Sequence, residues 1–314
     1  MALGGNAFLR KGENLDAMWA NVRRAAAVVA EIATHAAVLV VHGNGPQVGA
    51  LLEWAWRSHA RLRLDEAVAA TQGWLGYLLS QAIGDELAER LGERAVAAIV
   101  TQVVVSRSDP AWRRPSKPVG PYYGEEEARR LAEETGWAMG RDPRGGWRRL
   151  VASPLPQGVV EEDAIRALLG RLRVVVAAGG GGVPVVETGT GQLRGVEAVV
   201  DKDHAASLLA RRLGAETLLI LTDVDGFYRG YGSPTARLVE CITAREALKA
   251  VEEGEAPPGS MGPKLEAAAL FTLATGRPAV IARLERGLDA LRGRAGTWVL
   301  PGPLGRRGSR PGSC

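Results

Sequence analysis

The chain has 314 residues, of which 46% are hydrophobic and 24% are charged, and its formal net charge is +4. This composition lies near the globular average and excludes disordered and fibrous proteins. No apolar run approaches the roughly 18 to 20 residues that a membrane-spanning helix needs, and the first residues resemble no secretory leader. Residues 301–314 carry three arginines and no acid, and we expect them to form a disordered tail. The remaining body is nearly neutral, so we predict a cytoplasmic protein that binds neither membrane nor nucleic acid.

Apolar strands and helices alternate from one end of the chain to the other. The periodicity predicts, in chain order, helix 14–35, strand 37–41, helices 46–62 and 65–91, strand 96–105, helix 161–170, strand 173–178, helix 203–213, strand 217–222, helix 263–275, strand 278–282, helix 285–292 and strand 297–300. Apolar strands in this alternation predict an α/β fold, in which a mainly parallel central sheet is covered by helices on both faces.

Two stretches interrupt the alternation. Residues 112–157 are rich in Pro, Gly, Trp and Arg and are too long for a simple loop, so we expect an excursion from the main body. Residues 183–200 contain Thr-Gly-Thr-Gly between alternating residues, which predicts a hairpin.

Three glycine-containing turns are candidates for binding an anion. Gly43-Asn44-Gly45-Pro46 joins a strand to a helix, and a helix N-terminus with open amides attracts negative charge. An ordinary strand-to-helix turn explains this motif about equally well. Gly259–Lys264 repeats the pattern with a lysine in the first turn of a helix, where the dipole disfavours a cation unless an anion is bound nearby. Gly179–Gly182 indicates either close approach of the backbone to a ligand or a flexible hinge.

Lysine is unusually rare in this chain. Only five of the 39 basic residues are lysines, and they are Lys11, Lys117, Lys202, Lys249 and Lys264. A compact ammonium and a planar guanidinium are not interchangeable at a crowded phosphate, so a retained lysine is a candidate ligand of phosphate. For Lys11 and Lys249 we accept chance retention instead. Lys202 lies in Asp201-Lys202-Asp203, which taken alone reads as a helix cap with a solvated lysine.

Several known motifs are missing. The sequence contains no Walker loop and no Rossmann fingerprint, and its four histidines and two cysteines have no metal-ligand spacing. Residues 222–226 do not continue as a calcium loop, because the position of its final glutamate is occupied by Pro234. We therefore expect no dedicated metal site.

Nine motifs together resemble the carbamate kinases of the amino-acid kinase family. They are Ala-Leu-Gly-Gly-Asn-Ala at 2–7, Val-His-Gly-Asn-Gly-Pro-Gln-Val-Gly at 41–49, Thr-Gln-Gly-Trp-Leu-Gly-Tyr at 71–77, Pro-Ser-Lys-Pro-Val-Gly-Pro at 115–121, Gly-Trp-Arg-Arg at 146–149, Ala-Ala-Gly-Gly-Gly-Gly-Val-Pro at 177–184, Gly-Val-Glu-Ala-Val-Val-Asp-Lys-Asp at 195–203, Leu-Thr-Asp-Val-Asp-Gly at 221–226 and Gly-Ser-Met-Gly-Pro-Lys at 259–264. Other family members, such as acylglutamate kinase, carry a lysine on the first strand, where this chain has Leu3. Lys117 resembles its replacement, which favours the carbamate kinases over their relatives.

The resemblance implies an amino-acid kinase fold, a three-layer α/β sandwich in a single domain. Its N-lobe would span about 1–210 on the carbamate side, and its C-lobe about 211–300 on the nucleotide side. Residues 112–157 would form a protruding subdomain that closes over the site. The implied reaction is Mg²⁺-dependent phosphoryl transfer between ATP and carbamate, giving ADP and carbamoyl phosphate, in arginine catabolism with ATP synthesis. The implied assembly is a homodimer.

The resemblance also implies the site residues. Catalysis would depend on Lys117, Lys202, Asp203 and Lys264. The substrate and the transferring phosphoryl group would be bound by Gly4, Gly5, Asn6, Gly43, Asn44, Gly45, Gly180 and Gly181. The nucleotide would contact Asp223, Tyr228, Met261, Gly262 and Lys264, and its phosphates would hold the Mg²⁺ without a protein metal site.

Two other interpretations remain open from the sequence. One is a different amino-acid kinase that acts on a small carboxylate or phosphate, and the other is a nucleotide sensor that has lost catalysis. Only Met1-Ala2-Leu3 precede the first glycines, whereas strands average about five or six residues, so we expect either a late start or a shortened first strand.

Overall fold

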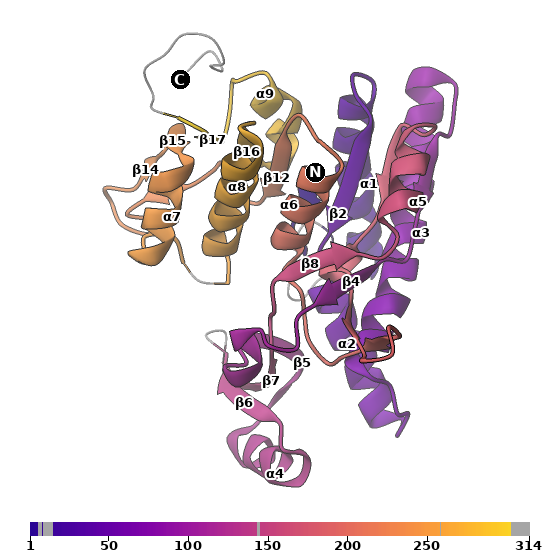
Figure 1. Ribbon diagram of the computed structural model, residues 1–314, viewed down its shortest axis with the longest axis vertical. Helices are drawn as coiled ribbons and strands as arrows, with labels where there is room; N and C mark the ends of the chain where they lie inside the picture. Colours follow the sequence, from indigo (N-terminus) through magenta and orange to yellow (C-terminus); the bar gives the residue numbers. More distant parts are fainter. Residues whose placement is uncertain (6–7, 9–14, 143–144, 258, 303–314) are drawn as a thin grey trace.

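The computed structural model of the chain describes residues 1–5, 8, 15–142, 145–257 and 259–302. A large sheet lies between two helical layers, and a smaller unit projects from one end of the molecule (Figure 1). Among the described residues, no helix is long and apolar enough to cross a membrane.

The helices occur at nine places along the described chain. They are α1 (Leu15–Ala33), α2 (Gly45–Arg57), α3 (Leu64–Leu91), α4 (Glu125–Thr135), α5 (Glu162–Leu169), α6 (Lys202–Arg212), α7 (Ala244–Glu252), α8 (Met261–Thr275) and α9 (Gly287–Leu291). Short 3₁₀ segments form at η2 (Pro110–Arg113), η3 (Gly179–Gly181) and η4 (Leu284–Arg286).

The main sheet has eight strands, and all its pairings are parallel except that between β16 and β17. Its spatial order is β15 (Cys241–Thr243), β17 (Thr297–Leu300), β16 (Ala279–Arg283), β12 (Leu218–Thr222), β1 (Ala2–Leu3), β2 (Val38–His42), β9 (Val174–Val176) and β3 (Val96–Ala98). The predicted α/β fold with a mainly parallel sheet is confirmed.

The described residues form three smaller sheets as well. A four-stranded sheet has the order β11 (Leu193–Gly195), β10 (Val183–Glu187), β4 (Gln102–Val105) and β8 (Pro156–Val159). A three-stranded sheet consists of β5 (Lys117–Tyr123), β7 (Trp147–Val151) and β6 (Ala138–Arg141), and a two-stranded ribbon of β13 (Tyr228–Arg229) and β14 (Arg237–Leu238). Antiparallel pairing of β10 with β11 confirms the predicted hairpin in 183–200.

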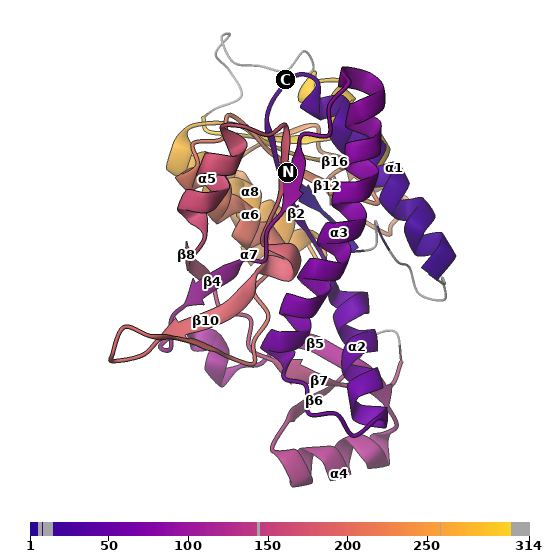
Figure 2. The same cartoon turned by 90° about the vertical axis from the view of Figure 1, so that its right-hand side faces the viewer.

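Alternating side chains of the main sheet enter two separate cores. In β12, Leu218 and Ile220 pack with α6, α7 and α8, whereas Leu219 and Leu221 pack with α1, α3 and α9. This follows from the twofold periodicity of a strand, which sends successive side chains to opposite faces. Figure 2 shows α1 and α3 on one side of the strands and α6 and α8 on the other. The two-sided burial explains why these strands read as continuous apolar runs.

The first strand is short but central. Ala2 and Leu3 pair in parallel with β12 on one side and β2 on the other, and both side chains are completely buried. The ladder continues past the strand, because Gly4 N donates to Leu221 O at 3.2 Å and Gly43 N donates to Leu3 O at 3.0 Å. This two-residue strand therefore fixes Gly4 and Gly43 side by side at the carboxyl edge of the sheet.

The predicted single strand over 96–105 is wrong, because this segment contributes to two sheets. β3 pairs with β9 in the main sheet, and β4 pairs with β10 in the four-stranded sheet. The side chain of Gln72 fixes the transition, since its Oε1 accepts from Thr101 N at 2.9 Å and its Nε2 donates to Thr101 O at 3.1 Å. An apolar run in the sequence does not reveal such a change of partner.

Other predicted boundaries need smaller corrections. The helix predicted over 46–62 ends at Arg57, because Ser58 Oγ donates to Trp54 O at 2.8 Å and His59 adopts a left-handed φ of 57°. The helix predicted over 285–292 is a 3₁₀ turn followed by the short α9. Neither β15 nor α7 was predicted, although Thr243 and Glu246 form a capping box at the start of α7.

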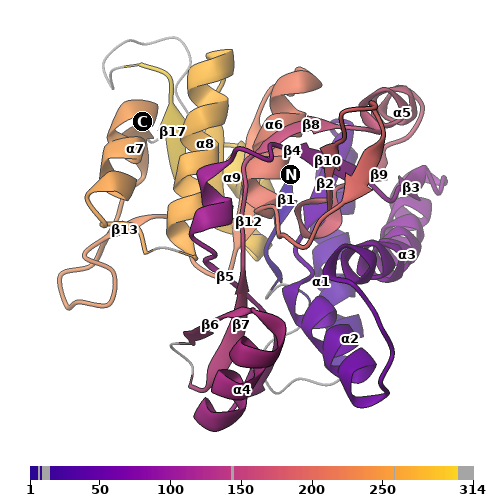
Figure 3. The same ribbon diagram turned by 60° about the horizontal axis from the view of Figure 1, so that its bottom comes forward.

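The excursion over 112–157 contains its own small fold. The helix α4 packs on β6 and β7, where Leu131, Ala128 and Tyr123 form a small separate core. This three-stranded sheet projects from the body at the bottom of Figure 1, and Figure 3 shows it coming forward beneath β12. The division of the chain into two lobes remains a prediction.

Candidate functional site

A cavity of about 570 Å³ opens at the carboxyl edge of the main sheet. The strands β1, β2 and β12 end there, which is where parallel α/β sheets generally bind their ligands. Most of the predicted site residues line it, namely Gly4, Gly5, Gly43, Asn44, Gly45, Lys117, Gly180, Lys202, Asp203, Asp223, Tyr228, Met261 and Lys264. Gly181 and Gly262 are not part of the lining, and Asn6 lies outside the described residues.

Two glycine turns meet backbone to backbone on one wall of the cavity. A Cβ atom on Gly43 would lie 2.7 Å from Gly5 N and 2.8 Å from Gly5 Cα, so only glycine fits there without movement. Helix α2 begins at Gly45, and the side chain of Asn44 does not cap it but donates from Nδ2 to Thr71 Oγ1 at 2.9 Å. Asn44 therefore does not cap the first amides of α2, which lie at the cavity wall. Such amides at a helix N-terminus suit an anion.

The four-glycine segment is shaped by neighbouring protein atoms. Gly180, Gly181 and Gly182 all have left-handed φ values, of 68°, 93° and 89°. A Cβ on Gly180 would overlap the side chain of Asn44, and a Cβ on Gly181 would overlap Val200 O. Close packing of the backbone thus accounts for these glycines, and only Gly180 of the two predicted positions lies on the cavity wall.

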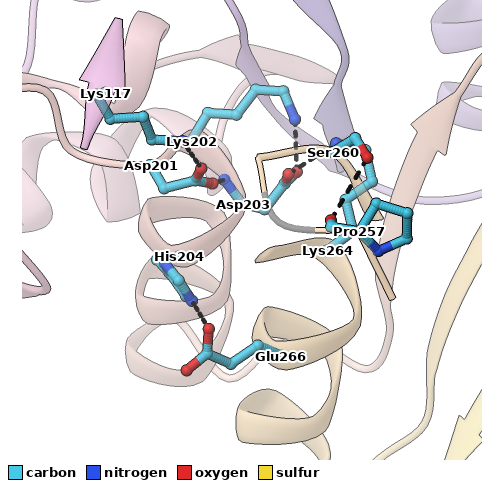
Figure 4. A network of polar contacts seen from close by, with 9 residues as sticks. All are labelled: Lys117, Asp201, Lys202, Asp203, His204, Pro257, Ser260, Lys264 and Glu266. Atoms are coloured by element: carbon cyan, nitrogen blue, oxygen red, sulfur yellow. Dashed lines mark hydrogen bonds and ion pairs between the residues drawn. The ribbon is translucent and has the colours of Figure 1, made fainter. Parts of the chain in front are cut away.

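A buried carboxylate joins two of the predicted lysines. Asp203 is 2% exposed, and its two oxygens lie 2.6 Å from Lys202 Nζ and 3.0 Å from Lys264 Nζ (Figure 4). Burial raises the pKa of the Asp203 carboxyl, but the charges of the two lysines outweigh burial and hold that pKa below its usual range. Asp203 is consequently a carboxylate at neutral pH.

The pKa values of the two lysines shift in opposite directions. Burial lowers the pKa of the Lys202 ammonium, and the attraction of Asp203 does not fully offset this effect. Burial also lowers the pKa of Lys264, but its contact with Asp203 raises it more, so the net shift is upward. Two ammonium groups and one carboxylate leave a net positive charge at the cavity wall, which favours a phosphate.

The third predicted lysine, Lys117, lies on the projecting sheet. Lys117 Nζ on β5 lies 2.6 Å from Asp201 Oδ2, although 84 residues separate the two in sequence. Asp201 also caps α6, since its Oδ1 accepts from Asp203 N at 2.9 Å. The sequence indicates Asp201 only as part of a helix-capping triplet, because nothing local predicts its pairing with Lys117.

Aromatic and charged side chains form the wall on the β12 and β16 side. Tyr228 Oη donates to Asp225 Oδ2 at 3.1 Å, and Arg283 Nε donates to Asp225 Oδ1 at 2.6 Å. The rings of Tyr228 and Tyr231 lie edge to face with centroids 6.0 Å apart. Since Tyr228, Tyr231 and Arg283 also line the cavity, this wall can contact a flat aromatic group such as a base.

Sequence reasoning missed several residues of the lining. Arg24 of α1, Arg283 and Glu285 all line the cavity, but arginines are so common in this chain that none of them stood out. A motif match to a larger set of sequences would be needed to single them out.

No group of three or more His, Cys, Asp or Glu side chains that could hold a metal occurs within the described part of the chain. Of the cavity carboxylates, Asp201 and Asp203 are already bound to lysines. Asp223 and Glu285 also line the cavity.

Comparisons with known proteins find similar sequences and structures over nearly the whole chain. A model of the amino acid kinase family matches residues 1–283. The carbamate kinase of Pyrococcus furiosus is 45% identical over 309 residues, covering 96% of this chain and 98% of that protein. The carbamate kinase of Escherichia coli K12 is 40% identical over 303 residues, covering 95% and 98%.

Solved structures are also similar to this chain over nearly its whole length. A crystal structure from Aeropyrum pernix K1 superposes with a TM-score of 0.90 at 46% identity, covering 96% of this chain and 98% of that chain. The carbamate kinase of Giardia lamblia bound to AMP-PNP superposes with a TM-score of 0.88 at 37% identity, covering 96% and 97%.

Proposed function

Since the chain belongs to the amino acid kinase family, and within it to the carbamate kinases, we propose that it transfers a phosphoryl group reversibly between ATP and carbamate. The products are ADP and carbamoyl phosphate. The observation that carries this proposal is the convergence of Lys117, Lys202 and Lys264, from three separate elements, on one cavity that is also lined by glycine turns and tyrosines.

The chemistry requires positioning and charge neutralisation. Carbamate is already an oxyanion, so its attack on the γ-phosphorus requires no general base. The amides around Gly5, Gly43 and Gly45 bind the acceptor and the transferring phosphoryl group. Lys202 and Lys264 neutralise the charge on the bridging and γ-oxygens, and Asp203 holds both ammonium groups in place. The two ion pairs with Asp203 restrict where these ammonium groups can lie, which reduces the reorganisation needed in the transition state.

The nucleotide occupies the wall formed by Asp223, Tyr228 and Met261. AMP-PNP in the Giardia lamblia relative supports a nucleotide in this fold. The hydroxyl of Tyr228 is already used by Asp225, so its ring is the part that remains for the base. Mg²⁺ accompanies the nucleotide phosphates and adds positive charge to the transferring group.

The projecting sheet completes the site with Lys117. Closing this sheet over the cavity excludes water, which would otherwise hydrolyse the phosphorylated product. We further propose a cytoplasmic homodimer that makes ATP from carbamoyl phosphate in arginine catabolism. Size-exclusion chromatography with light scattering tests the dimer, and the rate ratio of the two directions at cellular substrate concentrations tests the direction.

The decisive experiment is a coupled assay for ATP formation from ADP, Mg²⁺ and carbamoyl phosphate. Lys202→Ala should lower the turnover at least 100-fold, because it removes a buried charge from the phosphoryl site. The matched control is Lys249→Ala, since Lys249 lies exposed on α7 and pairs only with Glu253 among the described residues. This variant should stay within twofold of the parent. A folded protein that binds ADP by calorimetry but forms no ATP would instead support the nucleotide-sensor interpretation.

A further inference from the structure

Two ion pairs attach the projecting sheet to the body of the molecule. Lys117 of β5 contacts Asp201 at 2.6 Å, and Arg149 of β7 contacts Glu197 at 2.7 Å. Both carboxylates lie in the segment 195–203, and Val199 N in this segment also donates to Ala152 O at 3.0 Å. The segment 195–203 is therefore one place where the projecting sheet is held on the body.

In each of the two carboxylates, one oxygen accepts from a backbone N–H at a helix N-terminus and the other accepts from a cation of the projecting sheet. Asp201 Oδ1 accepts from Asp203 N in the first turn of α6, and Glu197 Oε1 accepts from Leu64 N in the first turn of α3 at 3.3 Å. The remaining oxygen of each receives the cation from the projecting sheet. Through Asp201 and Glu197, the projecting sheet is therefore connected to the N-termini of α6 and α3 in the body.

Only the Asp201 pair lies at the cavity. Asp201 and Lys117 both line it, whereas Glu197 and Arg149 do not. The side chain of Asp201 is 12% exposed, and its pKa is held well below the usual range because Lys117 and Lys202 outweigh the effect of burial. Asp201 is thus a fixed negative charge beside a cation that enters from a separate unit.

Lys117 has one described side-chain partner, which is Asp201. An ammonium carries three N–H donors, so a single bond to Asp201 leaves two of them for a ligand in the cavity. The four-carbon stem of a lysine has many rotamers, and an anchored ammonium has lost most of that freedom before the substrate arrives.

We propose that Asp201 is a positioning residue that holds the Lys117 ammonium on the cavity wall and so links docking of the projecting sheet to the catalytic end of α6. This inference rests on the proposed phosphoryl transfer, in which Lys117 contacts the transferring group. Asp201 acts through Lys117 and does not itself touch the phosphoryl group, since a second anion there would be repelled.

The test variant is Asp201→Asn. Asparagine retains an oxygen that can cap α6, because Asn and Asp are nearly equivalent at this position of a helix. Its other terminal atom becomes an NH₂ group, which faces the Lys117 ammonium with no charge to hold it. Turnover in the ATP-forming assay should fall about tenfold. Glu197→Gln removes the equivalent charge from the other ion pair and should stay within twofold.

A double-mutant cycle separates positioning from a structural role. In a Lys117→Ala background, Asp201→Asn should lower the residual turnover less than twofold, because the group that Asp201 positions is gone. An equal tenfold loss in both backgrounds would overturn the inference, since it would mean that Asp201 acts through α6 and not through Lys117.

A second readout does not depend on activity. Limited acetylation with acetic anhydride, followed by peptide mass spectrometry, reports how readily each lysine amine reacts. Labelling of Lys117 relative to exposed Lys249 should rise several-fold in Asp201→Asn and remain unchanged in Glu197→Gln. Unchanged labelling in Asp201→Asn would overturn the inference. If the parent protein makes no ATP, the proposed function fails, and this labelling still decides whether Asp201 anchors Lys117.

Discussion

Replacing Asp203 by Asn removes one negative charge that serves two buried ammonium groups. Asp203 is 2% exposed, and it lies 2.6 Å and 3.0 Å from the two lysine nitrogens. Breaking a buried ion pair by deleting one partner typically costs about 3 to 5 kcal/mol, because an uncompensated charge stays buried. For a chain of this size, each kcal/mol lowers the melting temperature by roughly 2 °C, so we expect a decrease of roughly 6 to 10 °C.

The loss of stability caused by Asp203→Asn should become smaller as pH rises. Without Asp203, the folded-state pKa values of Lys202 and Lys264 fall below the unfolded value of about 10.4. The unfolded chain then binds more protons than the folded chain, so the stability of the variant rises as pH increases toward about 10. In the parent, the raised pKa of Lys264 contributes stability that is fully present below the unfolded pKa and is lost only as pH rises through the folded pKa. The lowered pKa of Lys202 already makes the parent somewhat more stable as pH rises, but in the variant both lysines act in this direction. The difference in unfolding free energy should therefore shrink between about pH 7 and pH 9.5.

Urea unfolding followed by circular dichroism at both pH values measures this difference. Glu86→Gln serves as the control, because Glu86 forms an exposed pair with Arg90 at 3.0 Å, and such pairs contribute less than about 1 kcal/mol. An Asp203→Asn variant that unfolds within 1 kcal/mol of the parent, or whose loss is the same at both pH values, would refute the account of the buried network.

Three further predictions follow from other parts of the site. Burial lowers the pKa of His42 to about 4, so the folded chain should lose about 3 kcal/mol of stability as pH falls from about 6.5 to 4, and His42→Gln should flatten this dependence in urea titrations. Gly43→Ala should lower the melting temperature by several degrees, because the new Cβ would lie 2.7 Å from Gly5 N, whereas Gly45→Ala meets no atom within 4 Å and should leave it unchanged by scanning calorimetry. Tyr228→Ala should weaken ADP binding about tenfold in titration calorimetry, while Tyr228→Phe should weaken it less than threefold, because the hydroxyl already donates to Asp225; equal losses in both variants would contradict a role for the ring.

The sequence by itself determined the layered α/β fold and the turns at the sheet edge. Strands such as Leu218–Thr222 are buried on both faces, so they appear as unbroken apolar runs, and the glycines around Gly43 stand directly after such a run. The scarcity of lysine drew attention to five positions, and the motif resemblance selected Lys117, Lys202 and Lys264 among them without any coordinates. The strand and turn signals are local, since each depends on residues within about a dozen positions, and the lysine signal depends only on composition, so neither needs knowledge of which residues meet in the fold.

Tertiary structure decided how distant residues combine. The run over 96–105 divides between two sheets because Gln72, from a different element, binds the backbone of Thr101. Position 181 must be glycine because a Cβ there would overlap Val200 O, and not because it lines the cavity. Lys117 pairs with Asp201, which lies 84 residues further along the chain. Such pairings arise only when the folded chain brings separate elements together, because the residue types involved occur in many other contexts and carry no local signature of their partner.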